Sequence, residues 1–255
     1  MEDLLLAQLN ELLERAENGA KIKISECDSF LNQIPSFSDK HTIEDTRDFL
    51  DYLGNPQDNL NIIHVAGTNG KGSVCNYIST VLTKADYTVG MFTSPHLVSV
   101  NERFAIDGKP VSEGVFVEVF IETIRRVMEY GKEGYFPTYF EFLFFMAVIL
   151  YDVYPVDYLI LETGLGGRLD ATNAVANPIL TVITEIGYDH MQYLGTTSEQ
   201  IAAEKAGIIK RGVPVVFFDK RPQASEVIKN RALELDSRAI AVEARSIENV
   251  GICRD

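Results

Sequence analysis

Hydrophobic residues recur along this chain with two different spacings, which predict strands and helices in alternation. Short continuous apolar runs, bounded by Gly, Pro or Asp, have the length of buried strands; they lie at 61–66, 88–92, 156–162, 178–184 and 213–218. Runs that are apolar on both faces are typical of a mostly parallel sheet with helices on both sides.

Helical spacing fills the intervals between these runs. We predict helices at 1–19, 71–85, 112–131, 138–152, 197–206 and 222–235. Two of them carry an apolar stripe expected to face the core: Val74, Ile78, Val81 and Leu82 in the first, and Phe116, Phe120, Ile124 and Val127 in the second. The helix at 138–152 is apolar nearly all round, so we expect it to be buried.

The alternation predicts an α/β fold, a three-layer and mostly parallel sheet, in one domain over 1–255. Residues 1–59 form a helical lead-in, with turn residues at 34–37 and 53–59. A length of 255 residues and a hydrophobic fraction of 46% suit one large globular domain.

The charge balance excludes some classes of partner. Against 23 Lys and Arg stand 37 Asp and Glu, a net charge of −14, and this field repels nucleic acid and anionic membranes. It would repel ATP as well, so a nucleotide site must rely on local donors and metal. No stretch is apolar for long enough to span a bilayer, and the N-terminus lacks the pattern of a signal peptide.

The cysteines and histidines suggest neither a disulfide framework nor a zinc site. Cys27, Cys75 and Cys253 are odd in number and widely spaced, and no CxxC, HxxH or HExxH spacing occurs. This usage fits a reducing compartment, so we predict a cytoplasmic protein.

A glycine-rich segment, HVAGTNGKGS at 64–73, stands between a predicted strand and a predicted helix. This is the context of a phosphate-binding loop, in which backbone N–H groups and the helix N-terminus hold the phosphates. The predicted ATP-binding residues are Gly67, Thr68, Asn69, Gly70, Lys71, Gly72 and Ser73. Lys71 adds a full positive charge, and the Ser73 hydroxyl can ligate Mg²⁺. The segment departs from the common GxxxxGK[ST] pattern, with Val65 at the first glycine and Gly72 inserted; a plain connecting turn is the alternative.

Polar residues follow two of the other strands. In open α/β sheets ligands bind at the carboxyl ends of the strands, where Glu162 and His190 fall. Glu162 can reach a metal on the phosphates, and His190 can ligate a second metal. The structural alternatives are a carboxylate that caps a turn and a histidine without a special role. Lys205 has the spacing of a solvated helix lysine, and Arg168 can pair with an anionic substrate.

Five motifs together resemble a known family. HVAGTNGKGS, TSPHLVSVNERFAIDG, ETGLGGRLDATN, GYDH and AAEKAGIIKRGVPVV, in this order, are similar to those of folylpolyglutamate synthases and dihydrofolate synthases, relatives of the Mur ligases. The resemblance covers about residues 40 to 220, and GTNGKGS is the family's own form of the loop. It implies the fold of the Mur ligase central domain.

The resemblance also implies a reaction: ATP activates a carboxylate of a folate or dihydropteroate as an acyl phosphate, which the amine of L-glutamate attacks. By position, Lys71, Lys205 and His190 would be catalytic, and Ser73, Glu162 and His190 would bind two Mg²⁺ ions. Lys205 resembles a lysine that the family carbamylates. The implied folate-binding residues are Ser94, Pro95, His96, Arg103 and Asp170.

Family members continue into a Rossmann-like second domain, and this sequence stops at Asp255. We therefore expect the chain alone to bind MgATP weakly, with little or no ligase activity, and a separate C-terminal domain to be a partner. Folate- and glutamate-dependent ADP release by this polypeptide alone would contradict that expectation. The alternatives are a Mur-type ligase for a cell-wall precursor, an inactive or regulatory nucleotide-binding module and, more distantly, another P-loop NTPase or kinase.

Overall fold

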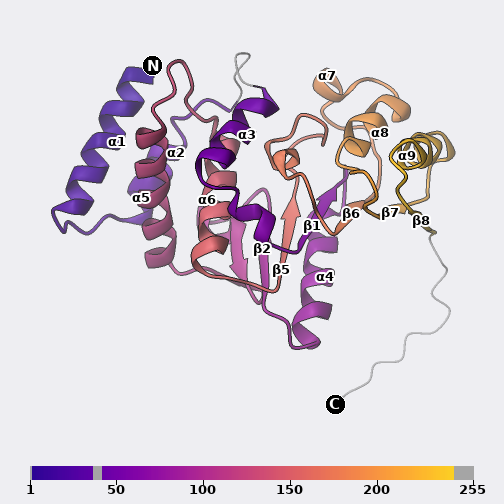
Figure 1. Ribbon diagram of the computed structural model, residues 1–255, viewed down its shortest axis with the longest axis horizontal. Helices are drawn as coiled ribbons and strands as arrows, with labels where there is room; N and C mark the ends of the chain where they lie inside the picture. The colour runs from indigo at the N-terminus through magenta and orange to yellow at the C-terminus, as the bar shows by residue number, and fades with distance from the viewer. Residues whose placement is uncertain (1, 37–41, 244–255) are drawn as a thin grey trace.

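A single eight-stranded sheet organises the computed structural model, which describes residues 2–36 and 42–243 (Figure 1). The strands lie in the order β4-β3-β2-β5-β1-β6-β7-β8. Their bounds are β1 Ile62–Ala66, β2 Val89–Phe92, β3 Phe104–Ile106, β4 Lys109–Pro110, β5 Tyr158–Glu162, β6 Leu180–Ile183, β7 Val215–Phe218 and β8 Ala239–Val242. The six strands from β2 to β8 in this order run parallel, and β3 and β4 add an antiparallel edge. The mostly parallel α/β sheet predicted from the sequence is confirmed.

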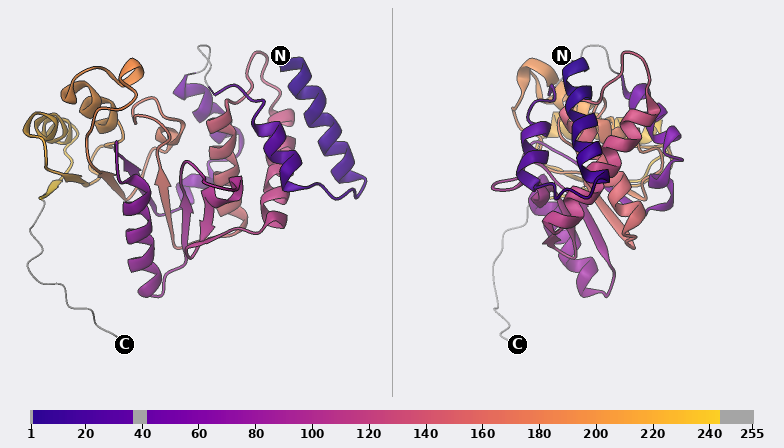
Figure 2. Two further views of the ribbon diagram at one scale, coloured as in Figure 1. Left: turned by 180° about the vertical axis from the view of Figure 1, so that it is seen from behind. Right: turned by 90° about the vertical axis from the view of Figure 1, so that its left-hand side faces the viewer.

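Nine α-helices and three short 3₁₀ helices accompany these strands within the described part of the chain. The helices are α1 Glu2–Glu17, α2 Ile24–Leu31, α3 Ile43–Tyr52, α4 Lys71–Lys84, α5 Glu113–Tyr130, α6 Tyr139–Val153, α7 Met191–Leu194, α8 Ser198–Ala206 and α9 Pro222–Glu234. The 3₁₀ helices are η1 Pro56–Asn59, η2 Val100–Arg103 and η3 Ala171–Ala174. Helices α1, α2 and α5 lie at one end of the molecule and α7 to α9 at the other (Figure 2).

Side chains alternate between the two faces of β1. Ile63 and Val65 pack in one apolar cluster with Val74, Ile78 and Leu82 of α4. Ile62 belongs to the cluster on the opposite face, which contains α6 and the phenylalanines of α5. The buried helix predicted at 138–152 is therefore confirmed as α6, and the predicted stripe of α5 is buried.

The structure corrects one residue of the predicted core face of α4. Cys75 and Ser79 are its fully buried residues, and Val81, assigned to the core stripe, is 68% exposed. The buried face runs through Cys75 and Ser79, whose small side chains let the helix lie close to the sheet, and the predicted Val74, Ile78 and Leu82 pack beside them. The prediction is therefore confirmed for these three residues and wrong for Val81.

Two parts of the sheet were not predicted. The β3–β4 hairpin turns at Asp107 and Gly108, both with positive φ, and an Asp-Gly pair of this kind is a sequence signal for a tight hairpin. The edge strand β8 is a short apolar run, Ala-Ile-Ala-Val, that is mostly exposed, and we did not predict it. In residues 2–36 and 42–243 no helix is long and apolar enough to cross a membrane. Cys253 lies outside the described residues.

Candidate active site

The phosphate loop leaves the central strand at the carboxyl edge of the sheet. Strand β1 is flanked by β5 and β6, so the segments that follow these three strands meet at one edge. Thr68 N donates to Glu185 O at 2.8 Å, and Thr184 Oγ1 donates to Asn69 O at 2.8 Å. The loop is thus held by the segment after β6, and α4 begins immediately after Gly70, which has positive φ.

Gly67 is the position where this loop most needs a glycine. Its φ of +155° lies at the limit of the left-handed region, and an added Cβ would stand 1.7 Å from Thr184 Oγ1. At Gly70 an added Cβ would meet nothing within 4 Å, and at Gly72 it would lie 3.8 Å from Glu162 Oε2. Gly67 is therefore required by the packing of the loop on Thr184, the residue after β6.

Two lysines converge on one carbonyl of the loop. Lys71 Nζ donates to Gly67 O at 3.2 Å, and Lys205 Nζ donates to the same oxygen at 2.9 Å. Lys205 lies on α8 and is only 3% exposed, so the solvated helix lysine that its spacing suggested is wrong. Burial, with the positive charge of Lys71 as the next cause, lowers the pKa of Lys205 to about 8.

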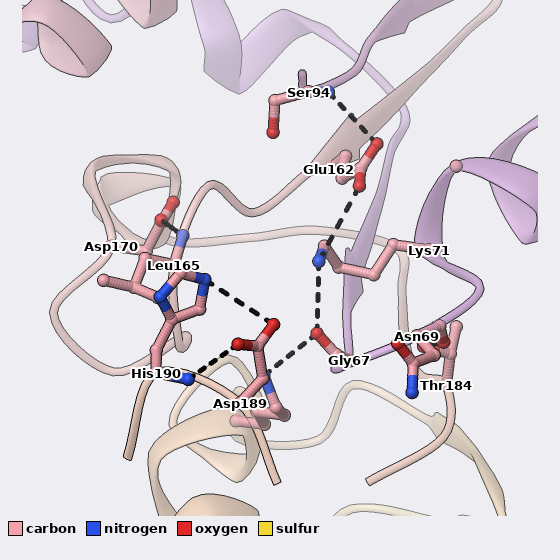
Figure 3. Close-up of polar contacts among 12 residues, drawn as sticks. Gly67, Asn69, Lys71, Ser94, Glu162, Leu165, Asp170, Thr184, Asp189 and His190 are labelled. Carbon is pink, nitrogen blue, oxygen red and sulfur yellow. Dashed lines mark hydrogen bonds and ion pairs between the residues drawn. The ribbon is translucent and has the colours of Figure 1, made fainter. Parts of the chain in front are cut away.

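Glu162 ends β5 beside the start of α4, where Figure 3 shows it between Ser94 and Lys71. Its Oε2 accepts from Ser94 N at 3.2 Å, and its Oε1 lies 3.9 Å from Lys71 Nζ. The side chain is 2% exposed, and burial raises the pKa of this carboxyl to about 7 against the opposing effect of Lys71. Because burial disfavours the ionised form of this carboxyl, a nearby cation would stabilise that form strongly.

Replacing Glu162 with glutamine should change how stability depends on pH. The folded pKa of Glu162 is raised, so its contribution to stability is fully present below about pH 4.5 and is lost as pH rises through about 7. Relative to the wild type, Glu162→Gln should therefore gain stability from pH 4.5 to 8, by an amount of the order of 3 kcal/mol. Urea unfolding at a series of pH values measures this, with the exposed Glu11→Gln as control. A stability difference that stays flat with pH would contradict it.

A pocket of about 790 Å³ opens beside this carbonyl and carboxylate. Predicted site residues from four separate segments line it: Thr68, Lys71, Ser94, Pro95, Arg103, Asp170 and His190. Glu162 and His96 adjoin it through contacts with Lys71 and Arg103 respectively, and Lys205 shares the Gly67 carbonyl with Lys71. The structure thus brings together the residues predicted for phosphate and those predicted for the second substrate.

Loop 163–173 forms a wall of the pocket and is tightly packed. An added Cβ at Gly164 would meet the Phe140 ring at 2.7 Å, and one at Gly167 would meet Glu204 O at 2.8 Å. Arg168, for which an anionic substrate was predicted, instead donates through Nε and Nη2 to Glu204 Oε1 at 3.1 and 2.9 Å. An anionic substrate would have to compete with Glu204 for this guanidinium, and the role of Arg168 in substrate binding stays a prediction.

The segment 93–103 is tied by its own polar groups. Glu102 accepts from the backbone N–H groups of Leu97, Val98 and Ser99 at 2.8 to 3.0 Å. Arg103 is 7% exposed, donates through Nε to His96 Nδ1 at 2.9 Å, and stacks 5.6 Å from the centre of the Tyr139 ring. Burial lowers the pKa of Arg103, whose guanidinium is a buried cation at the pocket wall.

His190 lines the same pocket, at the start of α7. It has a left-handed backbone, its N–H donates to Asp189 Oδ1 at 2.8 Å, and its Nε2 lies 3.6 Å from Asp189 Oδ2 (Figure 3). Among the described residues, no group of three or more His, Cys, Asp or Glu side chains is arranged to hold a metal ion.

Several pocket residues were not singled out in the sequence. Asp189 lines the pocket. It directly precedes His190 in the GYDH motif, and this position was the signal that could have identified it. Glu141 also lines the pocket; it is 6% exposed and accepts from Thr46 Oγ1 at 3.0 Å. An acid at the start of an otherwise apolar helix was the available signal. Tyr139 and Phe140 carried none, since they read as core.

Comparison with known proteins agrees with this geometry. No family model matches the chain. The chain is 46% identical over 187 residues to the dihydrofolate synthase/folylpolyglutamate synthase of Bacillus subtilis (strain 168). This match covers 71% of the chain and 42% of that protein. The chain thus spans less than half the length of this relative.

Solved structures give the same result. The apo form of L. casei FPGS superposes with a TM-score of 0.80 at 34% identity, covering 86% of this chain and 54% of that one. An FPGS complex with AMPPCP and folate gives the same TM-score, identity and coverages. Sequence, fold and topology agree with the motifs, and the chain belongs to the folylpolyglutamate synthase and dihydrofolate synthase family.

Proposed function

We propose that this chain is the ATP-binding part of a ligase that joins L-glutamate to a folate or to dihydropteroate. One observation carries the proposal: Lys71 of the phosphate loop and Arg103 and Asp170 of the substrate segments line the same pocket. A phosphate donor and a carboxylate acceptor bound there would be held close together, and such positioning is the main requirement of phosphoryl transfer.

Relatives support the choice of substrates. One similar structure is a complex of FPGS with AMPPCP and folate, and the B. subtilis relative is named for both synthase activities. In the proposed reaction a carboxylate oxygen of the folate attacks the γ-phosphorus of ATP, and ADP leaves. The glutamate amine then attacks the acyl carbon, phosphate leaves, and the amine loses a proton.

Named residues of this chain would divide the work. Backbone N–H groups of 67–73 and the Lys71 ammonium would hold the phosphates and stabilise the charge that develops on them. Arg103 would face the anionic or aromatic part of the folate, with Ser94, Pro95, His96 and Asp170 around it. We propose that residues 1–255 act as one unit, with 1–59 as its lead-in, and that a further C-terminal domain completes the glutamate site.

Oxygen donors suited to Mg²⁺ stand at the phosphate loop. The carboxylate of Glu162 and the hydroxyl of Ser73 are hard ligands, and the raised pKa of Glu162 shows how poorly the apo site stabilises its charge. Phosphate oxygens and water would complete this site, and His190 would belong to a second one. Bound Mg²⁺ would neutralise charge on the triphosphate.

Lys205 suits the carbamylation that its motif suggests. Carbamylation joins the neutral amine to CO₂ and releases a proton, and a pKa of about 8 leaves an appreciable neutral fraction at physiological pH. With ¹³C-bicarbonate at pH 8 and MgATP present, we expect a carbamate carbonyl signal in the ¹³C NMR spectrum. Lys205→Arg should lack this signal, whereas Lys229→Arg, at an exposed lysine of α9, should keep it. A wild-type spectrum without the signal would exclude the modification under these conditions.

Thermal stability with a set of ligands tests the proposal and its alternatives. We expect MgATP to raise the Tm of the chain, and dihydropteroate or a tetrahydrofolate to raise it further. Stabilisation by a UDP-sugar peptide instead of the folates would favour a Mur-type ligase. Stabilisation by MgATP alone would favour a regulatory nucleotide-binding module, and no nucleotide effect would contradict the proposal.

A further inference from the structure

His64, the first residue of the phosphate-loop motif, is fully buried within β1 and lies outside the pocket. It stands on the face of the sheet opposite α4, since its neighbours Ile63 and Val65 pack on α4. On that face it meets η3, the end of loop 163–173, where its Nε2 lies 2.8 Å from Thr172 Oγ1. A polar ring at 0% exposure in an apolar strand calls for a reason.

The hydrogen bonds between Thr172 and Asp170 indicate which atom donates in the contact between His64 and Thr172. Thr172 Oγ1 and N both donate to Asp170 Oδ1, at 2.5 and 3.1 Å, and Leu165 N donates to Asp170 Oδ2 at 2.8 Å. Since the one hydroxyl proton of Thr172 goes to the carboxylate, its oxygen accepts from His64. His64 therefore carries its proton on Nε2. Burial lowers the pKa of His64 to about 3, which keeps the ring neutral.

These bonds connect the two halves of the site. His64 is three residues before Gly67, and Asp170 and Leu165 both line the pocket. Within the described residues, Nδ1 of His64 has no hydrogen-bond partner, so Thr172 is the contact that orients the ring. The same contact fixes η3 against the central strand, and with it the wall of the pocket.

We propose that His64 is a positioning residue for the carboxylate substrate: through Thr172 and Asp170 it sets the wall of the pocket relative to the phosphate loop. The substrate affected rests on the proposed function, but the hydrogen-bond chain itself does not. A histidine that merely fills the core would stabilise the fold without favouring one ligand over another.

The tautomer is the first test, and it needs no variant. In ¹⁵N-histidine spectra of the wild-type protein we expect the His64 ring to show a protonated Nε2 and a bare Nδ1. A His64 ring protonated on Nδ1 would overturn the proposal, because Nε2 could not donate to Thr172.

A matched pair of variants tests the positioning. Glutamine places its amide nitrogen where Nε2 of histidine stands, whereas asparagine places it at the position of Nδ1. His64→Gln should keep folate affinity within about threefold of the wild type, and His64→Asn should lower it about tenfold or more. Both should keep MgATP affinity within about threefold. Equal losses for both ligands in His64→Asn would indicate a purely structural role and overturn the proposal.

Two further measurements keep the test decisive. If the His64 variants fold poorly, Thr172→Ser should keep the folate affinity of the wild type. The near-isosteric Thr172→Val, which has no hydroxyl to accept from His64, should lose it. Amide hydrogen exchange at Leu165 should accelerate about tenfold or more in His64→Asn or Thr172→Val. It should stay slow in the matched variants His64→Gln and Thr172→Ser. Unchanged exchange would overturn the proposal. A wild-type protein that binds no folate but shows these exchange effects would contradict only the proposed substrate.

Discussion

Replacing Lys71 with alanine will weaken MgATP binding by about 10- to 150-fold, because a charge-assisted hydrogen bond to phosphate contributes about 1.5–3 kcal/mol. In the structure the Lys71 ammonium already lies at the loop, 3.2 Å from Gly67 O and 3.9 Å from Glu162 Oε1. Isothermal titration of MgATP into wild type and variant measures the loss. Lys84→Ala, at an exposed lysine in the last turn of the same helix, is the control and should bind as the wild type does.

The same variant will also act on its two neighbours. Because the charge of Lys71 lowers the pKa of Lys205 and that of Glu162, its removal should raise both. A Lys71→Ala protein that binds MgATP as tightly as the wild type would show that the phosphates bind elsewhere.

Replacing Gly67 with alanine will destabilise the folded protein by about 3 kcal/mol or more, the largest effect expected at any loop glycine. The new Cβ would stand 1.7 Å from Thr184 Oγ1, so either the loop or the segment after β6 must move. Thr184 also donates to Asn69 O, and that bond would be lost with the movement. Urea denaturation measures the change in the free energy of unfolding.

The other loop glycines supply graded controls. Gly70→Ala meets no atom within 4 Å and should cost only the strain of a positive φ, about 1–2 kcal/mol. Gly72→Ala makes an ordinary 3.8 Å contact with Glu162 Oε2. Because alanine favours the helix more than glycine does, this variant should be more stable than the wild type by at most about 1 kcal/mol. A Gly67→Ala protein as stable as Gly72→Ala would contradict the packing described for the loop.

The sequence predicted the central part of this fold because its signals are local. Strands β1, β5 and β6 are continuous apolar runs, and the glycine-rich segment follows the first of them. Once these strands are parallel, their carboxyl ends must meet at one edge. That is why the sequence alone predicts that Lys71, Glu162 and His190 lie together.

The remainder depended on contacts between distant segments. Lys205 looked like a surface lysine, since spacing along α8 cannot reveal that its ammonium is buried against Gly67, 138 residues away. Arg168 looked free to bind substrate, yet Glu204 already accepts from it. His64 carried no signal of its own, since its partner Thr172 lies 108 residues further along the chain.

The most direct test of the account is a titration of MgATP into the ¹⁵N-labelled protein, followed by NMR at assigned amides. We predict that the amide signals of Gly67, Gly70 and Lys71 shift together along one binding curve, since these groups surround the phosphates. Signals of α1, at the far end of the molecule, should stay in place (Figure 1). Loop signals that do not move at saturating MgATP, with shifts elsewhere or none, would contradict the central claim that residues 64–73 bind the nucleotide.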